Sequence, residues 1–317
     1  MSEAIINDTE ARKNRLALPG RLRRNPIVVK ELRGRMRGNR AFVLITIYLA
    51  LLAGGIGIIF LSMLTARNSP SAVDVRQMMG KAIFWVVVSM ELLTVSFIAP
   101  ALTAGAISSE REHQTYDLLR ASLLPARSLV FGKLFTALSF IFLLLFAALP
   151  LQSLAFLFGG VAVEEFLIAS LLLVVSALAF SSIGILFSSL TKRTLVSTVL
   201  TYGAAIMVIF GLPILVFILA SVFQSFVNNL GNQMNVTTET LLVLGGWLLI
   251  SINPLATAVV TEAILINEQS AFYFAFPLSG GATFPILSPW ISYTLFYLLL
   301  SAVLILLSIH FVKRRET

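Results

Sequence analysis

Long stretches without a charged side chain determine what this chain can fold into. Five runs contain no charged residue: 41–64, 134–163, 166–191, 194–238 and 269–312. A sixth run, 82–109, is interrupted only by Glu91. A helix needs about 20 apolar residues to cross the hydrocarbon core of a bilayer, and each of these runs is longer than that. Charged residues make up only 12% of the chain, well below the share in soluble domains. The sequence therefore predicts an all-α membrane protein and excludes a soluble enzyme, a secreted module and a disordered tail.

The positions of lysine and arginine predict which face of the membrane each loop lies on. Six crossings fit the apolar runs, near residues 41–64, 82–107, 134–157, 166–190, 195–219 and 286–310. Of the 23 Lys and Arg residues, all but Arg67, Arg76 and Lys81 then fall on the side of the N-terminus. Because basic loops stay in the cytoplasm, we expect a multi-pass protein of the cell (plasma) membrane with both termini inside. One membrane domain, 41–312, would lie between a basic N-terminal segment, 1–40, and a basic tail, 313–317.

A further apolar stretch, 240–261, lies between the fifth and sixth crossings. It contains Asn253-Pro254, and the residue before a proline disfavours the helical conformation. Irregular backbone is tolerated at membrane depth where protein shields it. We therefore expect a re-entrant element that enters the membrane from the external face. A seventh crossing is the alternative, and it would place the basic C-terminus outside.

Residues 26–40 predict a helix that lies in the membrane interface. Asn25 is a good N-cap, and Pro26 suits the first helical position. An apolar stripe at a spacing of four residues consists of Val28, Leu32 and Met36. A basic stripe on another face consists of Lys30, Arg33, Arg37 and Arg40. This pattern is typical of a helix whose basic side contacts anionic lipid headgroups. A simple positive anchor for the first crossing is the alternative.

The loop after the second crossing predicts another short helix, on the cytoplasmic side. Ser109 and Glu112 have the spacing of a capping box, so we expect the helix to begin as the chain leaves the membrane and to end at Pro125. Its first residues carry mixed charge, and its later residues include four leucines: Leu118, Leu119, Leu123 and Leu124. Charged side chains can orient a docked protein, and leucines form an apolar contact that resists sliding. This combination is suited to binding a soluble partner protein. The alternative is a short amphipathic helix that only covers lipid.

The same loop carries a family resemblance. The stretch Ser109-Glu110-Arg111-Glu112-His113-Gln114-Thr115-Tyr116-Asp117-Leu118-Leu119, followed by 125–133 with its terminal Gly132-Lys133, resembles the signature of ABC-2 type transporter permeases. In that family a Glu-Arg-Glu run, a threonine, an acidic residue and a leucine pair follow the second crossing. The segment 25–33 and the six-crossing plan are also similar to family members. The chain departs from the pattern at Ser109, where a glycine is usual, and at His113-Gln114, which replaces a Lys-Gly type of pair.

The resemblance implies a permease subunit of an ATP-binding cassette transporter, often an exporter. The implied partners are a separate ATPase subunit, a second permease that is identical or related, and membrane lipid, but no nucleic acid. The implied coupling helix would present Glu110, Arg111, Glu112, Thr115, Tyr116, Asp117, Leu118 and Leu119 to the ATPase. The chain has no Gly-x-x-x-x-Gly-Lys-[Ser/Thr] phosphate loop. We therefore expect ATP and magnesium in the partner, and no enzymatic activity, cofactor or metal in this chain.

Glu91 is the one ionisable residue deep within a predicted crossing. A charge at the bilayer centre costs roughly 2.5–3.5 kcal/mol on insertion scales, so we expect the carboxyl group to face a helix interface or a wet cavity. It is a candidate pathway residue, with an interhelical hydrogen bond as the alternative. Gln152 and Glu262 are expected near the external side, where interfacial water can solvate them. An aromatic belt at the same interface is expected from Phe272, Tyr273, Phe274, Phe276, Trp290, Tyr293 and Tyr297.

Two other classes of function fit the composition. A self-sufficient secondary transporter or channel would use Glu91 as its proton carrier. Against it, the crossings contain only one deep acidic group and no inverted repeat with matched broken helices. The other class is a membrane scaffold that recruits the ATPase without transporting a substrate.

Overall fold

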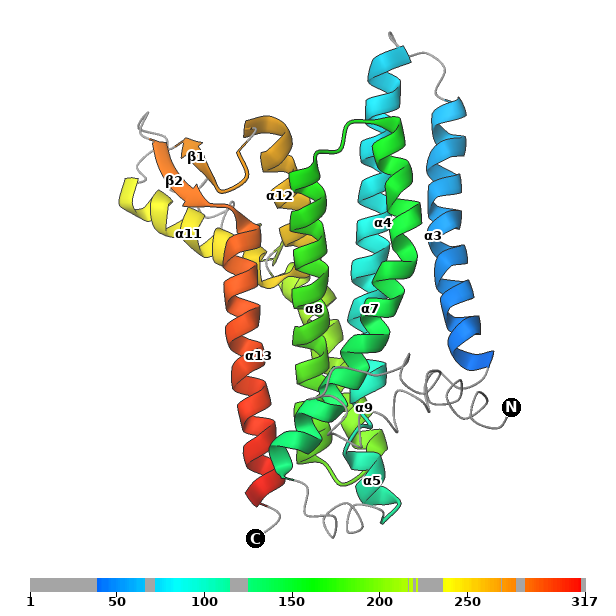
Figure 1. Cartoon of the computed structure of the whole chain (residues 1–317). Helices are drawn as coiled ribbons and strands as arrows, with labels where there is room; N and C mark the ends of the chain where they lie inside the picture. Colours follow the sequence, from blue (N-terminus) through cyan, green and yellow to red (C-terminus); the bar gives the residue numbers. More distant parts are fainter. Residues whose placement is uncertain are drawn as a thin grey trace, which may run out of the picture.

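The computed structural model describes residues 39–65, 72–114, 125–215, 217–218, 221, 236–268, 270–277 and 283–314. Among these residues, six helices are long and apolar enough to cross a membrane, which confirms the prediction of a multi-pass helical membrane protein. They form one bundle (Figure 1): α3 (Asn39–Thr65), α4 (Ala72–Thr103), α7 (Ala126–Phe158), α8 (Val163–Leu190), α9 (Thr194–Ile206) and α13 (Pro289–Arg314). The fifth of them reaches membrane length because α9 continues to Leu215. The predicted interfacial residues Lys30, Arg33 and Arg37 lie outside the described residues, whereas Arg40 belongs to the first turn of α3.

The bundle is built around α8. In the most apolar stretch of α8, 61% of the residues are buried, against 17% in the corresponding stretch of α3. The helices α4, α7, α9 and α13 all pack against α8. On the outer faces of the bundle, large apolar side chains such as Phe42 and Phe146 stay exposed, as expected of a surface that meets lipid tails.

Two glycines bring chain segments into close contact at opposite ends of α4. At one end, a Cβ atom on Gly80 would overlap the carbonyl oxygen of Gly159, in the connection between α7 and α8. At the other end, a Cβ atom on Gly184 of α8 would overlap the side chain of Thr103, the last residue of α4. Because only glycine allows so close an approach, both ends of α4 are held tightly against their neighbours.

The stretch 240–261 lies in a sharply bent pair of helices, α11 (Val236–Ile252) and α12 (Pro254–Glu268). Their axes bend by 119° at the break, which confirms the predicted break at Asn253-Pro254. The proline cannot continue α11 but suits the first position of α12. A bend of this kind fits both predicted arrangements, a re-entrant element and a seventh crossing that is broken at this point.

A β-hairpin follows α12 and is an addition to the predicted helical fold. Its antiparallel strands are β1 (Tyr273–Pro277) and β2 (Thr283–Leu287). They pack on α11 and α12 at one end of the bundle (Figure 1), around a small core of Trp247, Ile264 and Ile286. The aromatic residues of β1 thus form a strand, and two other members of the predicted belt, Tyr293 and Tyr297, are buried in α13. The belt prediction is wrong for these two tyrosines, because each hydroxyl finds a partner inside the bundle: Ser176 Oγ for Tyr293, and the Ile252 carbonyl for Tyr297.

Asn253 fixes the bend by bonding in two directions. Its side-chain oxygen caps α12 by accepting a hydrogen bond from the Ala256 amide at 2.8 Å. Its Nδ2 donates to the carbonyl oxygens of Val208 and Ile209 at 2.8 and 2.9 Å. These carbonyls belong to a single π-helical turn, η1 (Met207–Gly211), which continues α9. Such π turns frequently mark functional positions in helices. The bent pair is therefore tied directly to the fifth crossing.

Replacing Asn253 by alanine is expected to lower the free energy of unfolding by about 2 kcal/mol, because it removes a helix cap and leaves two buried carbonyls without their donor. Asn253→Ser is the matched control, since a serine retains the capping oxygen but cannot reach the π turn. We expect its stability, measured by thermal unfolding in detergent micelles, to lie between wild type and the alanine variant. An alanine variant as stable as wild type would show that the bend is held by the Tyr297–Ile252 hydrogen bond at 2.6 Å instead.

Candidate functional site

The predicted loop helix begins as α5 (Ser108–Glu112), at the end of the bundle opposite the hairpin (Figure 1). The predicted capping box between Ser109 and Glu112 is wrong. The Ser109 hydroxyl donates backwards to the Gly105 carbonyl at 2.6 Å, and the Ser109 amide donates to the same carbonyl at 3.1 Å. The first turn of α5 is therefore not an isolated helix end, and it needs no cap from its own side chains. It continues from α4 through a series of turns.

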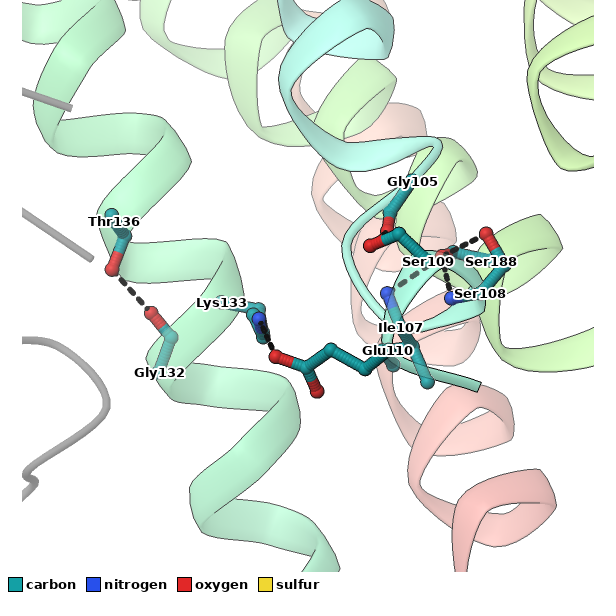
Figure 2. A network of polar contacts seen from close by, with 9 residues as sticks. All are labelled: Gly105, Ile107, Ser108, Ser109, Glu110, Gly132, Lys133, Thr136 and Ser188. Carbon is teal, nitrogen blue, oxygen red and sulfur yellow. Dashed lines mark hydrogen bonds and ion pairs between the residues drawn. The ribbon is translucent and has the colours of Figure 1, made fainter. Parts of the chain in front are cut away.

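Ser188 of α8 caps α5 from across the bundle. The amides of Ile107 and Ser108 both donate to its Oγ atom, at 2.8 and 3.0 Å (Figure 2). All three residues are fully buried. The first amides of a helix lack partners within the helix and must be satisfied from elsewhere. The helix cap that was predicted for Ser109 is thus provided by a buried serine on another crossing.

Glu110 connects α5 to the third crossing. Lys133 of α7 donates from Nζ to Glu110 Oε1 at 2.5 Å (Figure 2). The side chains are only 6% and 19% exposed, for Lys133 and Glu110 respectively. A charge-assisted bond of this length in a shielded place is among the strong polar contacts of a protein.

Arg111 and Glu112 connect α5 to the turn between α8 and α9. Arg111 Nη1 donates to the carbonyl oxygens of Ser189 and Thr191, at 2.7 and 3.4 Å. Glu112 Oε2 accepts from the Thr194 amide at 2.9 Å and so caps the start of α9. Hydrogen bonds from the side chain and the backbone amide of Thr194 lower the pKa of the Glu112 carboxyl group, so the capping carboxylate stays ionised at neutral pH.

We call these contacts of Glu110, Arg111, Glu112 and Ser188 the α5 anchor. They join the short helix to α7, to α8 and to α9, whereas the backbone joins it to α4. Of the eight residues predicted to face an ATPase, three therefore bind other parts of this chain. The other five, Thr115, Tyr116, Asp117, Leu118 and Leu119, lie outside the described residues. The exposed side chains nearest to them are those of His113 and Gln114.

Glu91 lies at a junction of three crossings. Its carboxyl group is fully buried in α4 and accepts a hydrogen bond from Gln152 Nε2 of α7 at 2.6 Å. The Tyr48 hydroxyl of α3 bonds to the same carboxyl group. The interhelical hydrogen bond that the sequence allowed is therefore present. Gln152 itself is 4% exposed, so its predicted place in interfacial water is wrong: the amide is needed inside as the partner of a buried carboxyl group.

A pocket of about 150 Å³ lies beside Glu91 and Gln152, between α7 and α8. Its remaining walls are mainly apolar and come from Phe142, Leu145, Phe146, Leu149, Leu173 and Val174. Phe146 is 69% exposed, so the pocket reaches the outer surface of the bundle. An apolar pocket with a few convergent polar groups is a common form of ligand site. Glu91 is thus the polar end of an apolar recess.

Glu262 is also buried instead of lying in interfacial water. Its side chain is 8% exposed and lies 3.9 Å from Lys81, which lies 3.5 Å from Glu165. Lys81 and Glu165 were not among the predicted site residues. Lys81 precedes the apolar run of the second crossing, and the sequence therefore predicts that it lies in an external loop. In the structure it lies within α4, which begins nine residues earlier, at Ala72. No feature of the local sequence indicates that these three charges meet.

Comparison with known proteins adds no family to this geometry. A scan against protein-family models gives no match, and a search of curated proteins gives none either. The resemblance to ABC-2 type permeases therefore depends on the residues of the α5 loop and on the arrangement of the crossings.

Proposed function

We propose that this chain is the permease subunit of an ATP-binding cassette transporter of the ABC-2 type, which exports its substrate. Its ATPase is a separate polypeptide that docks on the segment after α5, on the cytoplasmic side. The observation that carries the proposal is the α5 anchor: a helix of five residues with a buried polar contact to α8, a half-buried ion pair to α7 and an exposed cap on α9. A loop that only covered lipid would not need an ion pair with α7, a cap received from α8 and a cap given to α9.

The α5 anchor explains how a push on one loop moves several crossings together. Each contact is polar and directional, and those of Glu110 and Ser188 are also shielded, so a displacement of α5 is transmitted and not absorbed by sliding side chains. Glu110, Arg111 and Glu112 act as positioning residues that transmit force, and residues 113–124 supply the contact with the ATPase. Nucleotide binding shifts the permease only if the ATPase binds its two conformations with different affinity.

The energy for this cycle comes from the partner. The sequence contains no phosphate loop. The start of α3, the helix α5 and the end of α13, with its Lys313 and Arg314, lie at the same end of the bundle (Figure 1), which supports a common basic face. Two permeases and two ATPases make the working assembly, with α4 and α9 at the interface between the permeases. ATP closes the ATPase pair, the anchored helices move, and the substrate leaves on the external side; hydrolysis resets the cycle.

Site-specific cross-linking tests this proposal directly, because the chain contains no cysteine. We would introduce His113→Cys, whose position is exposed at the end of α5, and co-express the chain with candidate phosphate-loop ATPases from the same genome. A short thiol-to-amine cross-linker is expected to give a permease–ATPase product. Glu164→Cys is the control, since this position is also exposed but lies in the first turn of α8, at the other end of the bundle.

The expected result has two parts. His113→Cys gives the cross-linked product and Glu164→Cys does not. In intact cells, a membrane-impermeant maleimide labels Glu164→Cys and leaves His113→Cys unlabelled, which places α5 inside. Labelling of His113→Cys from outside, or the absence of a cross-link to any co-expressed ATPase, contradicts the proposal.

A second candidate is favoured by one observation, the buried Glu91 beside its apolar pocket. A secondary transporter would use this carboxyl group to carry a proton with its substrate. The hydrogen bond to Gln152 favours a structural role instead, because a proton carrier must exchange with water during each cycle.

A further inference from the structure

Three charged side chains meet at the hairpin end of the bundle, far from the α5 anchor. Lys81 comes from the first part of α4, Glu165 from the first turn of α8, and Glu262 from α12. Lys81 Nζ lies 3.5 Å from Glu165 Oε1 and 3.9 Å from Glu262 Oε1. The two carboxylate side chains are each 8% exposed, and the lysine side chain is 30% exposed. We call this group the outer charge cluster.

The outer charge cluster carries more negative than positive charge. Two carboxylates share one ammonium, and both distances exceed the 2.7–2.9 Å of a direct charge-assisted bond. Buried charges are normally paired and hydrogen-bonded, so an excess carboxylate at this depth takes up either a proton or a counter-charge. Lys81 is also the most exposed member, which means that it can leave while the two carboxylates stay.

Three oxygen atoms in and beside the outer charge cluster lack hydrogen-bond donors. They are Glu165 Oε2, Glu262 Oε1 and Thr261 Oγ1, and none has a hydrogen-bond partner within the described part of the chain. Thr261 is 2% exposed and lies next to Glu262 on α12. Buried polar atoms in native proteins are usually satisfied, so three orphans in one place indicate a missing group that donates hydrogen bonds.

A small cavity lies where these atoms meet. Its volume is about 30 Å³, and Glu165, Thr261 and Glu262 line it together with apolar side chains that include Phe84, Trp85 and Leu265. This space admits one group of about the size of a water molecule or an ammonium. The apolar side chains suit an organic body attached to that group, and the face of a tryptophan attracts cations. The indole of Trp85 also hydrogen-bonds to Glu262, which holds that carboxylate in place.

We propose that the outer charge cluster binds a protonated amine that carries N–H donors, in competition with the ammonium of Lys81. The positive charge of the amine balances the excess carboxylate, and its N–H groups satisfy the orphan oxygens. A quaternary ammonium supplies the charge but no donor, so it binds weakly. The amine is either a soluble compound or the headgroup of phosphatidylethanolamine, which is a primary amine. This site is independent of the ATPase, and it is tested on the isolated chain.

The test is a titration of the full-length chain in phosphatidylcholine nanodiscs with benzylammonium, followed by calorimetry, with empty nanodiscs subtracted. We expect saturable binding that is at least tenfold tighter than that of benzyltrimethylammonium, which has the same charge and ring. Glu262→Gln is expected to weaken benzylammonium binding at least tenfold. Lys81→Met is expected to strengthen it, because the competing ammonium is gone; a misfolded variant cannot produce that gain.

Equal affinity for benzylammonium and benzyltrimethylammonium would overturn the proposal. So would a Lys81→Met variant that binds benzylammonium no more tightly than wild type. The lipid arm identifies the source of the amine. If replacing part of the phosphatidylcholine by phosphatidylethanolamine weakens benzylammonium binding, the headgroup occupies the site; if the affinity is unchanged, the ligand is a soluble amine.

Discussion

Replacing Lys133 by methionine is expected to lower the free energy of unfolding by about 3 kcal/mol, because it leaves the Glu110 carboxylate in a shielded place without its cation. The same variant is expected to uncouple ATP hydrolysis from movement of the crossings, since α5 loses its contact with α7. Stability is measured by thermal unfolding in detergent micelles, and coupling by the ATPase rate of the reconstituted complex. Lys192→Met is the matched control: this lysine is exposed near the same end, and its loss is expected to change stability by less than about 0.5 kcal/mol.

A double-mutant cycle separates the ion pair from the general cost of either substitution. Glu110→Leu combined with Lys133→Met replaces a buried ion pair with two apolar side chains, which is often neutral or stabilising. We expect the double variant to recover most of the lost stability, with a coupling free energy of at least about 1 kcal/mol between the two positions. Strictly additive effects would contradict the role given to this pair in the α5 anchor.

Replacing Glu91 by leucine is expected to destabilise the bundle by about 3 kcal/mol. Gln152 and Tyr48 would each keep a buried polar group without its partner, at roughly 1–3 kcal/mol per group. Glu91→Gln keeps the size and an acceptor oxygen, so we expect it to cost less than about 1 kcal/mol. Both variants are compared with wild type by thermal unfolding in the same micelles.

The Glu91→Gln variant also separates the two candidate functions. An amide cannot carry a proton, so a secondary transporter would lose its proton coupling completely. The ATP-driven permease is expected to keep an ATPase rate within about twofold of wild type, because the hydrogen bond to Gln152 survives. A proton flux into proteoliposomes, followed with a pH-sensitive dye, that wild type shows and Glu91→Gln abolishes would favour the secondary transporter.

Features that depend on local sequence were predicted well. The apolar runs gave the six long helices, and Asn253-Pro254 gave the break between α11 and α12, because a proline acts on the residues next to it. The start of α4 was predicted too late, since Arg76 and Lys81 resemble loop charges when their partners are unknown. The hairpin was missed because its aromatic residues fit both a strand and a membrane interface.

Features that depend on distant partners were not predicted. Ser188 lies 80 positions from Ser108, and Glu112 lies 82 positions from Thr194, so no spacing rule connects them. A local capping box was the simplest interpretation of Ser109 and Glu112, and tertiary contacts replaced it. The sequence draws attention to Lys133 only because it ends the stretch that resembles the permease signature. Its ion pair with Glu110 becomes visible only in the fold. The outer charge cluster combines residues from three separate helices.

The close contacts at Gly80 and Gly184 restrict how this protein can change shape. If α8 slid along α4, the close contact of Gly184 with Thr103 at one end of α4 would break. The contact of Gly80 with Gly159 at the other end would break as well. We therefore expect α4, α8 and the connection between α7 and α8 to move together in any change of shape, with the displacement at the borders of this group. Among the six long helices, α3 buries the smallest share of its apolar stretch. Displacement is therefore expected most easily at the border with α3.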